Sequence, residues 1–264
     1  MQYKAGFIGC GNMGGALARA AYAASCGPIA VCDNDAAKTS LLCNECGAVC
    51  VDAPEIFGLS EFVFLGLKPQ IMLDAVTPWV ESINASDTVI VTMAAGLSIS
   101  FFKDTLKISR PIIRIMPNTP CSIGSGMILY SCSDSVTVEA EAAFLGVLKN
   151  AGLLDKLPEN LIDAASTVSG CGPAFAYIFA EALADAGVEC GLPRDKAILY
   201  ASQMLKGSAE MILKNGSPAT LKDNVCSPGG TTIAGVHALE SSGFRAAAMN
   251  AVTSAYKRTL ELKK

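Results

Sequence analysis

A glycine-rich segment near the start of the chain has the spacing of a dinucleotide-binding turn. Gly9, Gly11 and Gly14 form a GxGxxG sequence that follows an apolar run and opens an alanine-rich segment. Glycine at the first two positions lets the backbone turn tightly and approach a pyrophosphate, and the N–H groups of the next helix favour negative charge. An ordinary turn would not need three glycines at this spacing. We therefore predict a nucleotide cofactor bound through Gly9, Gly11, Asn12, Met13 and Gly14.

An acidic residue follows where a side chain would meet the adenosine ribose. Asp33 ends the next apolar run, 19 residues after Gly14, and its carboxylate could accept hydrogen bonds from the ribose in the NAD-preferring arrangement. Asn34 beside it, or Lys38 one turn later, could instead meet a 2′-phosphate. No arginine follows Asp33, which weakens the NADP interpretation, and Asp33 could equally be an exposed turn aspartate. The sequence leaves NAD and NADP both open.

Three further loops follow apolar runs of the same predicted sheet. Ligands on open α/β sheets bind outside the carboxyl ends of the strands, so these loops are expected to border the cofactor. Asn118 could bond the nicotinamide amide, or it could belong to a proline-bounded turn and bond its own backbone. Pro69 could have a packing or turn role alone. The candidate residues of these loops are Leu67, Lys68, Pro69, Ala94, Ala95, Gly96 and Asn118.

A second loop with chemical potential lies near residue 230, before an expected helix. Residues 227–232 read Ser-Pro-Gly-Gly-Thr-Thr, which combines hydroxyl groups and permissive glycines with a helix N-terminus. The unpaired N–H groups of such a terminus suit a small anion, in particular a carboxylate. A capped helix start needs only Thr231 or Thr232, and two adjacent glycines exceed what capping explains. His237, the single histidine, lies in the following helix, where packing or solvent exposure is commoner than catalysis.

The elements that position these loops follow from hydrophobic periodicity. Up to residue 157, short apolar runs alternate with helical segments, which predicts a doubly wound α/β sheet, mostly parallel and covered on both faces. The predicted strands are residues 5–8, 29–32, 48–51, 62–67, 88–92, 112–116 and 126–130, and the predicted helices are 13–25, 36–44, 71–80, 98–106 and 138–150.

From residue 158 onward only helices are predicted, at residues 162–186, 194–214, 232–241 and 245–262. We therefore expect two domains, a dinucleotide-binding domain over residues 1–157 and an all-helical domain over residues 158–264.

Composition narrows the class of protein. The 264 residues are 51% hydrophobic and 17% charged, which excludes a disordered chain. The net charge of −4 and the lack of a basic block argue against nucleic-acid binding. The best apolar run, residues 56–67, is interrupted by Ser60 and Glu61, whereas a membrane span takes about 20 apolar residues. The first residues run straight into a strand without a signal peptide. We expect a cytoplasmic protein that binds neither membranes nor nucleic acid.

The eleven cysteines include a cluster with CxxC spacing, formed by Cys43, Cys46 and Cys50. A zinc site would need a further thiolate or imidazole, and the single histidine is far away in sequence. Cys43 and Cys46 also have helical spacing in an apolar stretch, where cysteine acts as a small hydrophobic residue. We expect no metal.

Together these segments resemble the pyrroline-5-carboxylate reductase family. The most specific piece is residues 221–233, Leu-Lys-Asp-Asn-Val-Cys-Ser-Pro-Gly-Gly-Thr-Thr-Ile, which is similar to the family signature. Residues 6–14, 114–120 and 169–174 also fit, so the resemblance covers nearly the whole chain. Cys171 stands where many relatives have serine. The resemblance implies NADPH as the cofactor. Asp33 stands where relatives that prefer NADPH usually lack an acid, so NADH is the alternative.

The resemblance implies a Rossmann domain and a helical domain that interleaves with its twin, giving a homodimer that in relatives commonly assembles into a decamer. It implies hydride transfer from the reduced nicotinamide to the imine carbon of 1-pyrroline-5-carboxylate, the atom that becomes C5 of the product L-proline, in the last step of proline biosynthesis. By resemblance, Ser227 and the backbone of Gly229, Gly230, Thr231 and Thr232 hold the substrate carboxylate. The Thr232 hydroxyl faces the ring nitrogen as the catalytic group.

Two other functions fit the sequence less well. A 3-hydroxyacid dehydrogenase of the β type needs a catalytic lysine in its first long C-terminal helix, and residues 162–186 contain no lysine. A noncatalytic NADP-binding sensor should have a degraded substrate loop, whereas residues 227–232 are intact.

Overall fold

The computed structural model of the chain describes residues 1–24 and 27–262. The chain divides into two compact units, Met1–Cys171 with Ala255–Lys264 (unit 1) and Gly172–Ser254 (unit 2). The division falls after Cys171 because α7 (Glu159–Ser169) is held against the sheet of unit 1. The functional division at residue 157 stays a prediction.

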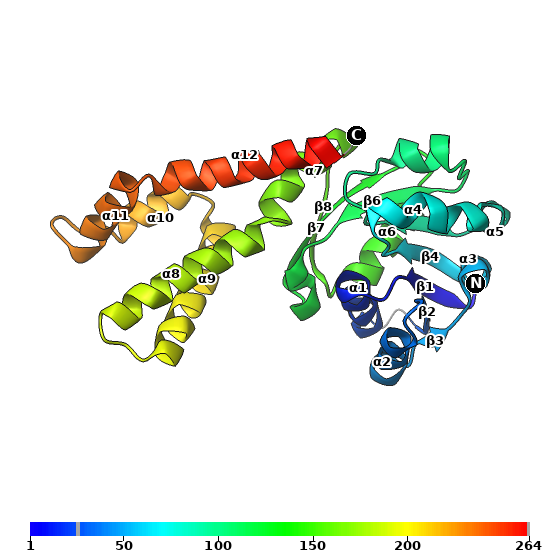
Figure 1. Cartoon of the computed structure of the whole chain (residues 1–264), viewed down its shortest axis with the longest axis horizontal. Coiled ribbons are helices and arrows are strands. Elements are labelled where there is room, and N and C mark those ends of the chain that lie inside the picture. Colours follow the sequence, from blue (N-terminus) through cyan, green and yellow to red (C-terminus); the bar gives the residue numbers. More distant parts are fainter. Residues whose placement is uncertain (25–26, 263–264) are drawn as a thin grey trace. The chain divides into compact units, whose positions relative to one another are not determined.

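Unit 1 is built on one eight-stranded sheet with the order β3-β2-β1-β4-β5-β6-β7-β8 (Figure 1). All neighbouring strands are parallel except β6 and β7. This confirms the predicted, mostly parallel, doubly wound sheet. The strands are β1 (Tyr3–Ile8), β2 (Ile29–Cys32), β3 (Val49–Cys50), β4 (Ser60–Leu65), β5 (Val89–Thr92), β6 (Ile112–Met116), β7 (Gly126–Cys132) and β8 (Gly152–Lys156).

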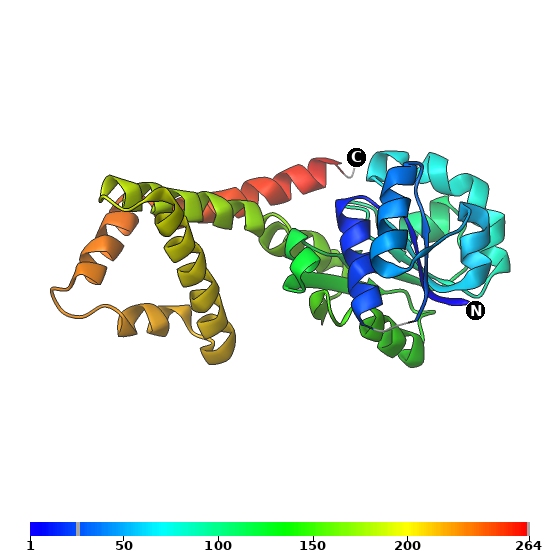
Figure 2. The ribbon, with the colours of Figure 1, turned by 90° about the horizontal axis from the view of Figure 1, so that it is seen from below.

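Helices cover both faces of this sheet, because the central strands are apolar on both sides (Figure 2). On one face, Phe7, Phe62 and Phe64 pack with side chains of α1, α2 and α6, among them Phe144. On the other, Val63 and Ile90 pack with α3, α4, α5 and the turn η2 (Phe101–Thr105). The helices are α1 (Asn12–Ala23), α2 (Ala36–Cys46), α3 (Ala53–Leu59), α4 (Pro69–Val76), α5 (Val80–Ala85) and α6 (Val138–Leu148).

The sheet brings the predicted loops together at the carboxyl ends of its parallel strands. Register pairs Ile8 with both Cys32 and Leu65, and pairs Leu65 with Thr92, so the parallel strands end level with one another. The chain proceeds outward from β1 toward β3 and from β4 toward β6, and the order reverses between β1 and β4. Such a reversal is where open α/β sheets bind ligands.

Unit 2, which the structure describes in full, consists of helices with almost no interior of their own. They are α8 (Gly172–Glu189), α9 (Arg194–Asn215), α10 (Pro218–Asn224), α11 (Thr231–Ser241) and the start of α12 (Phe244–Leu262). Helices α8 and α9 pack side by side (Figure 1). The buried residues of unit 2 are three alanines, Ala184, Ala197 and Ala201. In the described ranges no helix is both long and apolar enough to cross a membrane.

Several predicted elements differ from the structure. The expected helix over residues 162–186 is two helices, because the chain breaks at Gly170, where a Cβ would lie 2.8 Å from the carbonyl oxygen of Ser166. Helices α3, α5 and α10 and strand β8 were not predicted. The expected end of the first helix, at Ser25, lies outside the described residues.

Candidate functional site

The glycine turn after β1 is shaped by close backbone contacts. Gly9 has a φ of +91°, and a Cβ there would lie 2.6 Å from the carbonyl oxygen of Gly66. A Cβ at Gly14 would lie 1.9 Å from the carbonyl oxygen of Gly9. Both glycines therefore have no tolerable replacement, as the fingerprint requires. Gly66 in the loop after β4 is a partner that sequence reasoning missed, although a glycine ending an apolar run is a signal of close approach.

Gly11, unlike Gly9 and Gly14, has free space where a side chain would begin. A Cβ at Gly11 would have no heavy atom of the protein within 4 Å. Gly11 is the N-cap of α1 without a side-chain hydrogen bond, and the first turn of α1 has no acidic residue. No side chain therefore caps the first N–H groups of α1, and the space beside Gly11 is open. Both the room and the charge preference fit a dinucleotide pyrophosphate. Of the other predicted contacts here, Asn12 is exposed and Met13 is half-buried.

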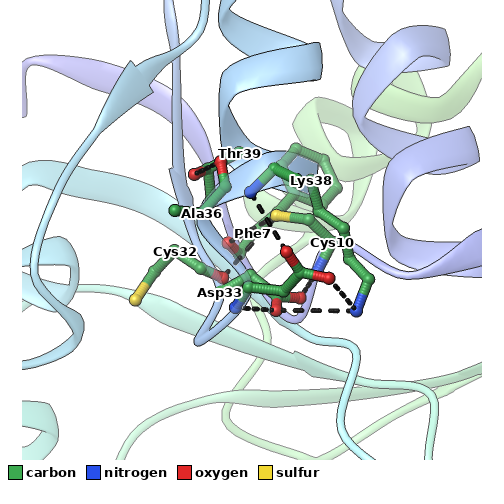
Figure 3. A network of polar contacts seen from close by, with 9 residues as sticks. Phe7, Cys10, Cys32, Asp33, Ala36, Lys38 and Thr39 are labelled. Carbon is green, nitrogen blue, oxygen red and sulfur yellow. Dashed lines mark hydrogen bonds and ion pairs between the residues drawn. The ribbon is translucent and has the colours of Figure 1, made fainter.

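Asp33 is tied to the glycine turn rather than free at the surface (Figure 3). Its Oδ2 accepts a hydrogen bond from the backbone N–H of Cys10 at 2.7 Å, and its Oδ1 accepts one from the backbone N–H of Asp35 at 2.8 Å. Only 13% of its side chain is exposed. The carboxylate therefore fixes the end of β2 against the loop that is predicted to hold the pyrophosphate. Each oxygen keeps a lone pair for a ribose hydroxyl, and that contact stays a prediction.

Lys38 is the cation nearest to Asp33 among the described residues. Its Nζ lies 3.8 Å from Oδ1 of Asp33 and 3.4 Å from Oδ2 of Asp35, and 46% of its side chain is exposed (Figure 3). Asn34 is exposed next to this group. A ligand phosphate at this place would meet one partly exposed lysine and two carboxylates.

Cys10 lies inside the glycine turn, where a reactive thiol would matter for the site. Burial, with the nearby charge of Asp33 as the second cause, raises the pKa of Cys10 to about 12. The thiol therefore stays protonated at neutral pH and is not a nucleophile.

The loops after β4 and β5 reach the same edge of the sheet, as expected. Lys68 is exposed and forms the N-cap of α4, and Pro69 is the first residue of that helix. Leu67 is half-buried. In the second loop, Ala94 is buried, Ala95 is exposed and Gly96 has a φ of +79°. Their contacts with a cofactor stay a prediction.

Asn118 uses its side chain to hold two other segments of unit 1. Its Oδ1 accepts a hydrogen bond from the N–H of Met127 at 2.9 Å, and its Nδ2 donates to the carbonyl oxygen of Ser169 at 2.9 Å. The residue is 9% exposed. Asn118 thus joins β7 to the end of α7, instead of bonding its own backbone as the alternative interpretation had it. The predicted nicotinamide contact of Asn118 stays a prediction.

A buried ionic network supports the loop after β5, and sequence reasoning missed it. Arg114, 1% exposed, lies 2.6 Å from Asp163 and 3.3 Å from Glu159, both in α7. The guanidinium of Arg114 donates to Oδ1 of Asp163 and to Oε1 of Glu159. Oε1 of Glu159 also accepts a hydrogen bond from the backbone N–H of Ile99 at 2.7 Å. The network thereby holds the segment that follows Gly96. The available signal was a single arginine within the apolar strand of residues 112–116.

The loop before α11 presents an uncapped helix N-terminus. Gly229 has a φ of +67°, and the N–H of Gly230 donates to the carbonyl oxygen of Ser227 at 3.0 Å. Gly230 is the N-cap of α11, and no side chain bonds the terminus, so Thr231 and Thr232 do not cap it. A Cβ at Gly230 would lie 2.4 Å from Oγ of Ser227, so only glycine leaves this hydroxyl in place.

A hollow of about 520 Å³ lies beside this loop within unit 2. It is lined by Gly229, Gly230, Ile233, Ala234, Val236, His237 and Glu240. His237 is exposed there, in agreement with one of the two interpretations of its position. The free N–H groups of α11, the Ser227 hydroxyl and the adjoining hollow suit a small ligand with a carboxylate.

The cysteine cluster does not form a metal site in the part of the chain that the structure describes. Among those residues, no three His, Cys, Asp or Glu side chains are grouped so that they could hold a metal ion.

Comparison with known families matches both halves of the chain. Residues 159–262 match the family described as pyrroline-5-carboxylate reductase dimerisation. Residues 4–96 match the family described as NADP oxidoreductase, coenzyme F420-dependent.

Several relatives that match this chain over nearly its full length are named pyrroline-5-carboxylate reductase. The pyrroline-5-carboxylate reductase of Escherichia coli is 38% identical over the full length of both chains. The solved structure of Plasmodium falciparum pyrroline carboxylate reductase with NADP bound is 30% identical, with a TM-score of 0.85, and covers 99% of this chain and 100% of its own. The pyrroline-5-carboxylate reductase of Coxiella burnetii is 27% identical, with a TM-score of 0.91, over the full length of both chains.

Proposed function

The chain belongs to the pyrroline-5-carboxylate reductase family, and we infer that it reduces 1-pyrroline-5-carboxylate to L-proline with NADPH as the hydride donor. The enzyme is an oxidoreductase that acts on a C=N bond, in the last step of proline biosynthesis. The observation that best supports this substrate is the structure of the loop before α11. Its uncapped N-terminus, open beside the Ser227 hydroxyl, is a receptor for the substrate carboxylate.

The residues of the chain divide the work between the two ligands. In unit 1, Gly9, Gly11 and Gly14 let the backbone approach the pyrophosphate, and the loops after β4, β5 and β6 border the nicotinamide half of the cofactor. In unit 2, the N–H groups of Gly230, Thr231 and Thr232 and the Ser227 hydroxyl hold the substrate carboxylate. NADPH, when bound, supplies the hydride. Holding donor and acceptor in a near-attack arrangement is the main catalytic contribution of the protein.

Thr232 is proposed as the catalytic residue. It is the second residue of α11 and its side chain is exposed at the loop that holds the carboxylate. A hydroxyl there can hydrogen-bond the ring nitrogen of the imine and hold its proton. A protonated imine nitrogen draws electrons from the imine carbon, which becomes C5 of proline, and makes that carbon accept a hydride, so no nucleophilic residue is needed.

The proposed reaction is tested by isotope transfer. With NADPH deuterated at the transferred position, L-proline formed from 1-pyrroline-5-carboxylate should carry one deuterium at C5, located by mass spectrometry of the product. The hydrogen that moves as a hydride does not exchange with water. Unlabelled proline, or no proline, would contradict the assignment.

Cofactor choice is expected to depend on Asp33. Its carboxylate lies where the adenosine ribose is expected, and a 2′-phosphate there would be repelled while Lys38 compensates in part. At an effective dielectric between that of water and a protein surface, one charge pair a few ångströms apart is worth roughly 1–2 kcal/mol. Asp33→Asn should therefore raise the ratio of kcat/KM for NADPH over NADH by about tenfold. Steady-state rates with each cofactor measure the ratio.

Asp35 offers a matched control for this variant. Asp35→Asn removes the same charge two residues away, and asparagine keeps the cap that Asp35 provides to the N–H of Ala37. The Asp35 variant should change the ratio by less than about threefold. Equal changes in both variants would mean that the overall negative charge at this end of α2, rather than Asp33 itself, determines the preference between NADPH and NADH.

The helical unit is a dimerisation domain, and its surface needs a partner. Its buried residues are three alanines, while large apolar side chains such as Tyr177, Ile178 and Met249 are more than 60% exposed. A groove of about 610 Å³ between α8 and α9 is lined in part by Tyr177, Ile178 and Ile198. Apolar exposure on this scale is typical of an interface that a second chain covers.

Replacing an exposed apolar side chain of this groove with a charged one should break the assembly. Ile178→Asp places a carboxylate on the apolar part of the groove, beside Tyr177 and Ile198, and its desolvation in an interface opposes association. At micromolar concentration the variant should have a lower mass than the wild type in light scattering. Val138→Asp on unit 1, where Val138 is 79% exposed at the start of α6, is the control and should keep the mass of the wild type. A normal mass for Ile178→Asp would contradict an interface on this groove.

We extend the proposal to the larger assembly and to location. Dimers assembling into a decamer would give a mass of ten chains in the same experiment, and a mass of two chains would reject the decamer.

A cytoplasmic location agrees with the ten described cysteines, all of which are free thiols.

A further inference from the structure

Two cysteines that the proposed reaction does not use face one another at the edge of the sheet. The Sγ atoms of Cys43, in α2, and Cys50, in β3, lie 3.4 Å apart. Cys50 is exposed and Cys43 is half-buried. A disulfide has an S–S length of about 2.0 Å, so a small rotation of each side chain would bring the two atoms to bonding distance.

The local fold holds this pair together. α2 ends at Cys46, and Gly47 follows with a φ of +60° and its N–H bonded to the carbonyl oxygen of Cys43 at 3.0 Å. This left-handed turn reverses the chain at once, so that β3 returns beside the helix that it follows (Figure 1). β3 is in turn fixed by its pairing with β2, where Cys50 lies opposite Val31. The thiols are therefore adjacent because of backbone structure rather than a chance rotamer.

We propose that Cys43 and Cys50 form a reversible intramolecular disulfide by exchange with a small disulfide of the glutathione type. Cys46, although it belongs to the CxxC sequence, takes no part, because it is 4% exposed in the core beneath α2. The pair is the modification site, and neither thiol belongs to the residues assigned to cofactor or substrate.

The two thiols have different roles in the exchange. Cys50, exposed to solvent, is accessible to the incoming reagent as a thiolate, attacks one sulfur of the small disulfide and releases one small thiol. Cys43 then gives up its proton and attacks Sγ of Cys50, which releases the second small thiol and closes the protein disulfide. Two protein thiols are oxidised by two electrons, and one small disulfide is reduced to two thiols. Burial, and the contact with Cys50, raise the pKa of Cys43 and so lower its thiolate fraction, and Cys43 therefore reacts second, when Sγ of Cys50 is already adjacent to it.

The experiment oxidises the full-length protein and locates the bond. The reduced enzyme is incubated with oxidised glutathione, the remaining thiols are blocked with N-ethylmaleimide, and the chain is cleaved after lysine, arginine and glutamate. Cleavage after Lys38, Glu45 and Glu55 separates residues 39–45, which contain Cys43, from residues 46–55, which contain Cys46 and Cys50. A disulfide between the two segments appears as a linked peptide pair two hydrogen atoms lighter than the sum of its reduced parts.

The variants distinguish the outcomes. The wild type and Cys46→Ala should give the linked pair, and dithiothreitol should remove it. Cys50→Ser should lose it, and Cys43→Ser should instead keep a glutathione adduct on Cys50, since the resolving thiol is gone. A linked pair that persists in Cys50→Ser would assign the bond to Cys43 and Cys46 and overturn the proposal. A stable glutathione adduct on Cys50 of the wild type, or no reaction, would overturn it as well.

Discussion

Replacing Thr232 with alanine should lower turnover with 1-pyrroline-5-carboxylate by about 100-fold, while the KM for NADPH stays near that of the wild type. The hydroxyl is proposed to hold the proton on the ring nitrogen, and that proton keeps the imine carbon electrophilic until the hydride arrives. The N–H groups of α11 that are proposed to hold the carboxylate do not depend on the side chain. The loss should therefore fall on kcat, measured by steady-state rates at saturating cofactor.

Thr232→Ser is the matched control, because serine keeps the hydroxyl and loses only a methyl group. It should retain at least about a tenth of the wild-type turnover. Full activity in Thr232→Ala, or an equal loss in both variants, would remove Thr232 from the chemistry. In the second case the methyl group would be the important part.

Replacing Gly11 with alanine should weaken NADPH binding by about 100-fold, which corresponds to about 2.7 kcal/mol. A Cβ at this position would touch no atom of the protein, and the backbone conformation of Gly11, with φ −67° and ψ −167°, is accessible to alanine. The fold should therefore tolerate the methyl group, which would occupy the space assigned to the pyrophosphate. Titration of the cofactor followed by fluorescence measures the dissociation constant.

Gly58→Ala is the control for this prediction. Gly58 lies in α3, and a Cβ there also has no neighbour within 4 Å, but no cofactor contact is expected. Both variants should unfold at temperatures close to that of the wild type, and Gly58→Ala should bind NADPH normally. Normal binding by Gly11→Ala would show that the pyrophosphate does not approach this turn.

The architecture of unit 1 was predictable because strand periodicity and the glycine turn are local signals. The central strands were found near their observed positions, and residues 29–32 and 112–116 match the structure. Short elements escaped: α3 is seven residues long and begins at a proline-containing turn, and β8 carries Asp155 and Lys156 in a partly exposed edge strand. Helix α10 was hidden between Pro218 and Pro228, where punctuation by proline suggested a loop.

The shape of the glycine turn was predictable from residue type, because close backbone contacts at Gly9 and Gly14 exclude a side chain. The cofactor contacts of Gly9, Gly11 and Gly14, and of Asp33, stay predictions. The bond from the N–H of Cys10 to Asp33 could not be predicted, because it depends on how the end of β2 meets the turn after β1, which is a tertiary contact. The buried pairing of Arg114 with Asp163 joins residues far apart in sequence. No local sequence pattern predicts such a pairing.

The central claim is tested most directly by following the loss of reduced-nicotinamide absorbance with purified protein and 1-pyrroline-5-carboxylate, with NADPH and NADH in parallel. We predict rapid oxidation that requires the imine, and the ratio of the two rates reports the influence of Asp33. A folded protein that binds NADPH and oxidises neither cofactor in the presence of the imine would contradict the account and indicate a noncatalytic cofactor-binding protein.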